Sequence, residues 1–358
     1  MIAAFALAGC TVGPDYHRPA VEVPGQFNAA ATQPAASQPA TTQAAATQPV
    51  VDLRRWWETF NDPALNRLIV QATASNLDVR LAAARVREAR AQVLFNRAAL
   101  FPTLDSSAEY SRNQLSKNAF GANAASSATT GATATGTPSL PGRTDLYRAG
   151  FDAGWELDVF GGTRRAIEAA QYTLEAQVEA RRSALVTLLS EVAQNYIMLR
   201  GFQHELAIVQ NNVAAQRDTL DLTRTRLQAG IATSLDVARS EAQVASTESQ
   251  VPTLQTQIKQ ALERLAVLLN RTSADLEAEL APEAQLPGGP PQVPAGLPSE
   301  LLRRRPDVRQ AERQFAAATA NIGVATADLF PKFNLTGSLG LESLQLKTFA
   351  NSSSLFWS

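Results

Sequence analysis

Residues 76–102 read NLDVRLAAARVREARAQVLFNRAALFP, and residues 305–331 read RPDVRQAERQFAAATANIGVATADLFP. The second stretch repeats the first at a constant offset of 229 residues, so that position 76 matches position 305. Asp-Val-Arg matches near the front, Leu-Phe-Pro at the end, and several alanines match in register between them. This period is far longer than the ~20–50 residues of a solenoid repeat. The chain is therefore predicted to be internally duplicated, with each half built as a helix, Leu-Phe-Pro and a further element.

The element that follows Leu-Phe-Pro is predicted to be a β-strand, because the hydrophobic period changes there from helical to two. Alternation runs over residues 104–111 and 333–342, and most regularly over 147–159. On residues 147–159 the apolar face holds aromatic residues, and the other face carries the charges of Arg148, Asp152, Glu156 and Asp158. A half-buried hairpin of a soluble domain and a transmembrane strand with a polar lumen face both explain this pattern.

A long helical hairpin is predicted between these strands. Residues 163–229 contain no helix breaker except Gly201, and ~65 helical residues make a rod of roughly 100 Å. Apolar residues recur every seven positions, which predicts a left-handed supercoil, at Leu185, Val192, Leu199, Leu206, Val213, Leu220 and Leu227, and again at Val237, Val244, Val251, Ile258 and Leu265. The short turn at 230–234 makes the arms antiparallel, with Gly230 as C-cap and Thr233 or Ser234 as N-cap. Pro252 predicts a kink in the second arm.

The N-terminal region is predicted to carry a lipid. Residues 1–10, MIAAFALAGC, form a short apolar run that ends in a sequence similar to the lipobox of bacterial lipoproteins, so residues 1–9 are interpreted as a signal-peptide remnant. Cys10 is the single cysteine, which excludes a disulfide within the chain and favours acylation. Residues 25–50 consist almost wholly of Ala, Thr, Gln, Pro and Ser, and residues 10–50 are therefore predicted to be a lipid-anchored, disordered tether.

Composition and motifs argue against catalysis. Lys plus Arg number 32 and Asp plus Glu 33, so nucleic acid is not the expected partner. The two histidines, His17 and His204, lie far apart, and no phosphate-binding loop, nucleophile motif or metal-ligand cluster is present in the sequence. No apolar run reaches the ~18 residues of a transmembrane helix. No catalytic residue, metal or cofactor is expected, apart from the covalent lipid on Cys10.

Several short motifs follow one another along the chain. They are Cys10-Thr11-Val12-Gly13-Pro14-Asp15-Tyr16, Trp57 with Phe60, Asp62 and Pro63, Trp155-Glu156-Leu157-Asp158-Val159-Phe160-Gly161, the turn around Gly230 with Asp236-Val237, and Arg304-Arg305-Pro306-Asp307-Val308. Taken in this order, the motifs resemble the TolC-type outer-membrane efflux proteins, in the lipoprotein branch that is paired with resistance-nodulation-division pumps. They are spread over nearly the whole chain, so their joint order is more specific than any single motif.

The resemblance implies a mainly α fold with membrane β-strands. Long antiparallel coiled-coil helices would form a trimeric α-barrel in the periplasm, joined to an outer-membrane β-barrel that the three subunits share. A homotrimer is expected because the few strands of one subunit would leave open edges in lipid. The protein would be lipid-anchored in the outer membrane and act as the passive export duct of a tripartite efflux system, with a periplasmic adaptor and an inner-membrane pump as partners.

The resemblance also implies site residues. The adaptor-contact tip would comprise Gly230, Thr233, Ser234 and Asp236, although helix capping alone also explains this turn. The lumen-facing residues would be Arg148, Asp152, Glu156 and Asp158. A type I protein-secretion duct and a periplasmic coiled-coil scaffold lipoprotein remain alternative functions, and the transported substrate is not predicted.

The predicted boundaries follow from these elements. The first repeat spans 51–280, with a β-hairpin at 103–160 and a coiled-coil hairpin at 163–270. A connector at 281–298 leads to the start of the second repeat at 299–358. This second copy is expected to be truncated before its fourth strand and second helical hairpin, so no gate residues are assigned.

Overall fold

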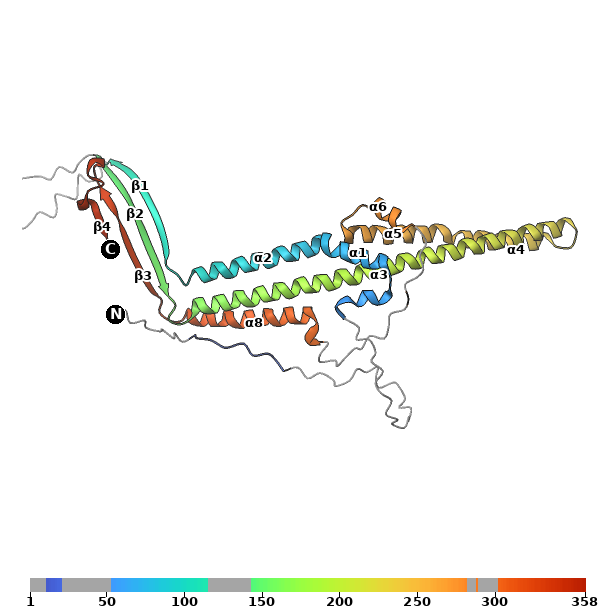
Figure 1. The fold of residues 1–358 in the computed structure, drawn as a ribbon, viewed down its shortest axis with the longest axis horizontal. Helices are drawn as coiled ribbons and strands as arrows, with labels where there is room; N and C mark the ends of the chain where they lie inside the picture. The colour runs from blue at the N-terminus through green and yellow to red at the C-terminus, as the bar shows by residue number, and fades with distance from the viewer. Residues whose placement is uncertain (1–10, 21–52, 115–142, 282–287, 289–301) are drawn as a thin grey trace, which may run out of the picture. The chain divides into compact units, whose positions relative to one another are not determined.

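The computed structural model of the protein describes residues 11–20, 53–114, 143–281, 288 and 302–358 (Figure 1). The predicted signal remnant, Cys10, residues 21–50 of the tether and most of the connector lie outside the described residues. The described residues form two compact units. Unit 1 contains residues up to 17, 90–172 and 315–358, and unit 2 contains residues 18–89 and 173–314.

The internal duplication is visible in the secondary structure. Helices α2 (Leu77–Ala98) and α8 (Pro306–Ala327) both have 22 residues and begin at equivalent positions of the repeat. Both helices close with the same turn: the Leu100 and Phe101 amides donate to the carbonyls of Arg97 and Ala98, and Leu329 and Phe330 do the same toward Thr326 and Ala327. A strand follows each turn, β1 (Thr103–Gln114) in the first copy and β3 (Phe333–Ser343) in the second. The predicted order of helix, Leu-Phe-Pro and strand is confirmed in both copies.

Unit 1 contains an antiparallel sheet in the order β1-β2-β3-β4 (Figure 1). Its longest strand is β2 (Arg143–Leu157), which pairs with β1 on one side and β3 on the other. The expectation that the chain stops before a fourth strand was wrong, because β4 (Leu355–Trp357) pairs with Leu339–Leu341 of β3. Two short 3₁₀ helices, η3 (Leu346–Thr348) and η4 (Ser352–Ser354), connect β3 to β4.

Helix α3 (Gly162–Gln228) is one uninterrupted helix of 67 residues, as predicted. The returning arm consists of α4 (Ser234–Glu248) and α5 (Gln250–Leu269), with the break at Ser249. The break lies three residues before Pro252, which has no backbone N–H to donate to the preceding turn. The seven-residue spacing lies on the packed face of the arms, since the following members are buried: Val192, Leu199, Val213, Leu220, Val244 and Leu265.

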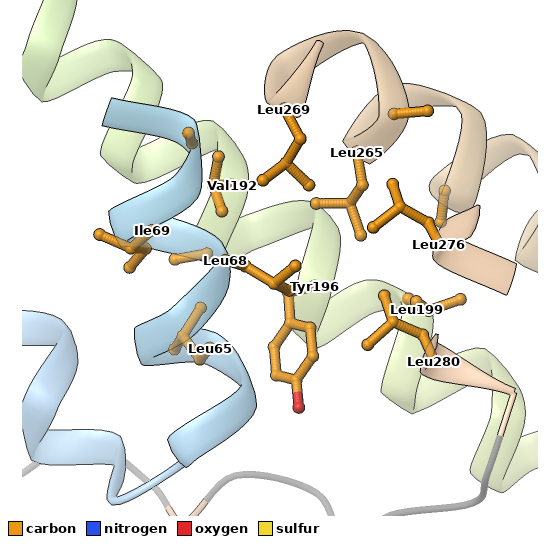
Figure 2. Close-up of a cluster of buried hydrophobic side chains, with 14 of the residues drawn as sticks. Leu65, Leu68, Ile69, Val192, Tyr196, Leu199, Leu265, Leu269, Leu276 and Leu280 are labelled. Carbon is orange, nitrogen blue, oxygen red and sulfur yellow. The ribbon is translucent and has the colours of Figure 1, made fainter. Parts of the chain in front are cut away.

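The core of unit 2 lies where α1 (Pro63–Ser75) and α6 (Ser273–Leu280) pack against α3 and α5 (Figure 2). Leu65, Leu68 and Ile69 of α1 follow a helical spacing and are fully buried. Asp62 caps α1: its side chain accepts the Ala64 N–H at 2.7 Å and the Leu65 N–H at 3.2 Å. Trp56 and Trp57 of the 3₁₀ segment η2 (Leu53–Phe60) pack on the same cluster.

The N-terminal boundary of the tether differs from the prediction. Residues 11–16 lie against the start of α3 and against α8 in unit 1, with the Val12 N–H donating to the Phe160 carbonyl at 3.2 Å. The prediction of a disordered tether was therefore wrong for this segment. Its composition is polar and proline-containing, but its partners belong to other parts of the chain.

Candidate functional site

The register of the sheet separates two chemically distinct faces. On β1, β2 and β3 most residues paired with one another have the same character, with Ser106 opposite Phe151 and Ser343 opposite Tyr147 as exceptions. The alternation of the three strands is therefore in phase. One face contains the apolar set Leu104, Tyr110, Tyr147, Phe151, Trp155, Leu335, Leu339 and Leu341. The opposite face contains the polar set Asp105, Glu109, Arg148, Asp152, Glu156, Asn334, Ser338 and Glu342. Since the strands are far apart in sequence, this agreement is a property of the folded sheet.

The apolar face of the sheet is open in this structure. Leu104, Phe151, Leu335 and Leu339 are each more than half exposed. Contiguous apolar surface of this kind is rare on soluble monomers and marks a membrane or protein interaction surface. The strands of 12, 15 and 11 residues also reach the ~9–11 residues that a tilted strand needs to cross a bilayer.

Three of the four predicted lumen-facing residues share the polar face. Arg148, Asp152 and Glu156 alternate along β2. The Arg148 guanidinium lies 4.0 Å from the Glu342 carboxylate and stacks over the Phe356 ring at 4.7 Å. Asp152 lies directly opposite Asp105 on β1, an arrangement of like charges that is unfavourable unless water solvates both carboxylates. This face is therefore suited to a hydrated space.

The fourth predicted residue, Asp158, does not belong to the strand face. β2 ends at Leu157, and the Asp158 carboxylate instead accepts the backbone N–H groups of Thr163 and Arg164 at 3.2 and 3.0 Å. It also accepts from the Arg164 side chain at 3.1 Å. Asp158 satisfies the free amides at the start of α3. The prediction that it continues the polar face of the strand was therefore wrong, because the start of α3 needs an acceptor from the preceding loop.

The predicted tip is the turn between α3 and α4, and its residues form caps. Gly230 adopts a left-handed conformation with φ of 75°, and the Ile231 N–H donates to the Arg226 carbonyl at 2.9 Å. Thr233 is the N-cap of α4, and the Asp236 carboxylate accepts from the Thr233 N–H, which completes a capping box. The Thr233 hydroxyl, which donates to the Asp236 carboxylate at 2.7 Å, and then the Thr233 N–H lower the pKa of Asp236 below its ordinary value. Ser234 is the first residue of α4 and not its cap.

Two apolar residues at this tip were not predicted. Ile231 is 78 % exposed and Leu235 is 56 % exposed, whereas the capping residues are occupied by their own hydrogen bonds. A large aliphatic residue directly after the turn glycine is the sequence signal that could have identified Ile231. Their exposure makes Ile231 and Leu235 better candidates for a partner contact than Thr233 or Asp236.

Within the described ranges, no cluster of three or more His, Cys, Asp or Glu side chains has the arrangement of a metal site. None of the helices in the described part of the chain combines the length and hydrophobicity needed to span a bilayer. Cys10, the predicted lipidation site, lies outside the described residues.

Comparisons with known proteins agree with these features. The sequence profile of the outer membrane efflux protein family matches residues 68–271 and 297–357. Nodulation protein T of Rhizobium leguminosarum bv. trifolii is 32% identical over 337 residues, and the pyoverdine export outer membrane protein OpmQ of Pseudomonas aeruginosa is 36% identical over 288 residues. The matches cover 93% and 80% of this chain but 64% and 58% of those relatives. The toluene efflux pump outer membrane protein TtgI of Pseudomonas putida is 33% identical over the whole of this chain and 71% of its own length.

Solved structures show the same architecture. The outer-membrane channel OprN superposes with a TM-score of 0.79 at 34% sequence identity, covering 98% of this chain and 72% of that channel. The MtrE outer membrane channel of Neisseria gonorrhoeae superposes with a TM-score of 0.71 at 27% identity, covering 98% of this chain and 71% of that channel. With the duplicated helix and strand unit, the supercoiled hairpin and the two-faced sheet, these matches place the chain in the outer membrane efflux protein family.

Proposed function

We propose that the protein is a subunit of the outer-membrane duct of a tripartite efflux system, through which small molecules leave the cell passively. The two-faced sheet carries this proposal, because it combines an exposed apolar face with a polar face that is in register over three strands. The supercoiled hairpin of α3 to α5 then forms one part of the wall of a periplasmic conduit. The names of the relatives support small-molecule export, since they refer to pyoverdine and toluene.

The duct is proposed to be a homotrimer. In the described sheet, β1 and β4 are the terminal strands and each pairs with one neighbour. A strand edge exposed to lipid leaves backbone groups without hydrogen bonds, at several kcal/mol for each group. Pairing of these edges with strands of further copies removes the cost, so assembly and membrane insertion are coupled.

Within this duct the polar face of the sheet lines the lumen. Arg148, Asp152 and Glu156 would contact water and passing solutes, and the pairing of Arg148 with Glu342 moderates its charge. No bound cofactor is needed for passive conduction. The energy for transport would come from an inner-membrane pump.

The tip of the helical hairpin is proposed to meet a periplasmic adaptor. Gly230, Thr233, Ser234 and Asp236 shape the turn, and Ile231 and Leu235 supply the exposed contact surface. A charge at Asp236 cannot be reversed without breaking its capping box, so Ile231→Asp is the more informative change. We expect it to reduce crosslinking to the adaptor, whereas Gln210→Asp, an exposed position away from the tip, should not.

The N-terminus is proposed to be acylated at Cys10 in the outer membrane. Support comes from the lipobox-like sequence before Cys10 and from its being the single cysteine. Incorporation of radiolabelled palmitate, and its loss in a Cys10→Ser variant, tests this part of the proposal.

The duct itself is tested by conductance. The protein purified from outer membranes should form a heat-resistant trimer and conduct ions across a planar bilayer. A folded trimer that passes no current would refute the duct, and a monomer released from membranes by Cys10→Ser would instead support a periplasmic scaffold. Restored secretion of a polypeptide, without restored export of toluene-like solutes, would favour a type I secretion duct.

A further inference from the structure

A second site lies in unit 1, where the N-terminal residues Thr11–Tyr16, here called the strap, dock on the chain. The Arg165 side chain is 5 % exposed and holds the strap. Its guanidinium donates to the carbonyls of Val12 and Gly13 at 3.1 and 3.2 Å, and to the Asp15 carboxylate at 2.7 Å. Glu168 accepts the remaining hydrogen bond at 2.7 Å. Three of these four hydrogen bonds are made to the strap, so its departure would remove most of the partners of this guanidinium.

The strap lies against α8 at a point where both segments have a glycine and neither has room for a side chain. A Cβ atom on Gly13 would lie 2.4 Å from the Gly323 Cα atom, and Gly13 has a φ of 95°. A Cβ atom on Gly323 would in turn lie 2.9 Å from the Arg165 side chain. The absence of a side chain at Gly13 thus lets the strap approach the backbone of α8, and its absence at Gly323 leaves room for the Arg165 side chain.

The duplicated helix shows that this docking surface is specific to one copy. In α2 the position equivalent to Gly323 is Leu94, which is exposed. A leucine at this point of α8 would collide with the Arg165 side chain, since a Cβ atom at position 323 already lies 2.9 Å from it. The strap thus breaks the symmetry of the duplication, and α8 differs from α2 where the strap binds.

Both ends of the strap are fixed by further contacts. Thr11 packs on Gly161, which separates β2 from α3, and a Cβ atom at Gly161 would lie 2.9 Å from the Thr11 Cα atom. Tyr16 makes edge contacts with the rings of Tyr172 and Phe315, with centroids 6.0 Å apart in both cases. The strap is therefore bound along its length.

We propose that the strap holds the lipid-modified end of the chain at the junction of β2 and α3, with Arg165 as its positioning residue. This inference rests on the acylation of Cys10 in the proposed function, since Cys10 directly precedes Thr11 in the sequence. If β2 crosses the bilayer and α3 extends into the periplasm, Gly161 marks the membrane surface. Cys10 is the neighbour of Thr11, which packs on Gly161. Acyl chains on Cys10 would therefore enter the membrane leaflet that is nearest to the end of β2. The strap aligns the lipid anchor with the sheet and raises the local concentration of the sheet at the membrane during assembly.

Docking of the strap is tested by proteolysis of the membrane-embedded protein. Chymotrypsin cleaves after aromatic residues, and the bond after Tyr16 is protected while that ring is packed. Cleavage follows the population of the open state when opening is fast. Arg165→Ala removes charge-assisted hydrogen bonds that each contribute about tenfold or more, so we expect cleavage after Tyr16 to accelerate at least about tenfold. Gly13→Ala, which leaves the helices intact, should do the same, and Arg181→Ala, an exposed arginine of α3, should not.

The positioning role is tested by combining Arg165→Ala with Cys10→Ser and following heat-resistant trimer formation in cells. We expect Arg165→Ala to slow trimer formation when Cys10 is present and to have no added effect in the Cys10→Ser background. An equal loss in both backgrounds, or unchanged cleavage in Arg165→Ala and Gly13→Ala, would overturn the inference. Absence of palmitate from the wild-type protein would instead refute the acylation itself, and the two failures are therefore distinguishable.

Discussion

The strongest quantitative expectation concerns Asp62, which joins a helix cap to a buried tyrosine. One carboxylate oxygen caps α1, and the other accepts the Tyr196 hydroxyl at 2.6 Å. Tyr196 is fully buried, and its hydroxyl also accepts from Arg200 Nε at 3.3 Å. Burial and then the Asp62 hydrogen bond raise the pKa of Tyr196, in agreement with a hydroxyl that donates to a carboxylate.

Asp62→Ala should destabilise this region by about 2–4 kcal/mol. Loss of an N-cap costs about 1 kcal/mol. The Tyr196 proton is then left without an acceptor in the interior, which costs about 1–3 kcal/mol. Asp62→Asn keeps one oxygen for the cap but places an N–H₂ donor opposite the Tyr196 hydroxyl, so it should recover only the about 1 kcal/mol of the cap.

Amide hydrogen exchange of the protein in detergent measures this effect, because exchange of α1 amides reports the free energy of local opening. At 1.4 kcal/mol per factor of ten, the predicted change accelerates exchange over Pro63–Ser75 by about 30- to 700-fold. Tyr196→Phe removes the hydroxyl that Asp62→Ala leaves unsatisfied. The loss of stability in the double variant should therefore be about 1–3 kcal/mol smaller than the sum of the losses in the two single variants. Strict additivity would refute the argument that the hydroxyl carries most of the cost.

Three further predictions follow from other parts of the chain. Gly230→Ala forces alanine into a left-handed conformation and should cost about 1–2 kcal/mol in thermal unfolding, whereas Gly201→Ala, in the interior of α3 with open space around it, should stabilise by about 0.5–1 kcal/mol. Leu339→Arg on the apolar face places a charge in lipid at a cost of about 2–4 kcal/mol and should lower the yield of membrane-inserted protein. The neighbouring Ser338→Arg on the polar face should insert normally. Equal yields of the two variants would contradict the membrane assignment of the faces. The Arg305 hydrogen bond lowers the pKa of Asp307 to about 2, so its contribution to stability is present above about pH 4 and is lost as the pH falls toward 2. A carboxyl ¹³C titration should show Asp307 still ionised at pH 3, and a normal value in wild type or no rise in Arg305→Ala would contradict this.

Most of the helices and strands could be predicted because their signals are local. The duplicated block ends both copies at the same turn, and the heptad spacing defines the packed face of α3. Asp62 and Pro63 mark the start of α1, and Gly230 marks the end of the long hairpin arm. In each case residues within one or two turns satisfy the backbone groups concerned, so the pattern and its structural cause lie in the same stretch.

The errors occurred where the partner is remote or is shared between neighbouring elements. Asp158 continues the strand alternation in the sequence, but the unpaired amides at the start of α3 recruit it as an acceptor. The three residues of β4 are too few to show a period, and they are ordered by pairing with β3. Only the folded structure brings Arg165 to the strap, across about 150 positions of sequence.

The amino-acid order alone thus specified the duplication, the supercoiled hairpin and a strand with two unlike faces, since these depend on periods of 229, seven and two residues. Tertiary structure was needed to show that the faces of three strands agree in register, that the predicted tip residues are occupied by capping, and that Arg165 holds the strap. The physical reason is the range of the interactions. Periodicity reflects which side of an element is buried, whereas register, caps and docked segments depend on hydrogen-bond partners that become neighbours only after the chain has folded.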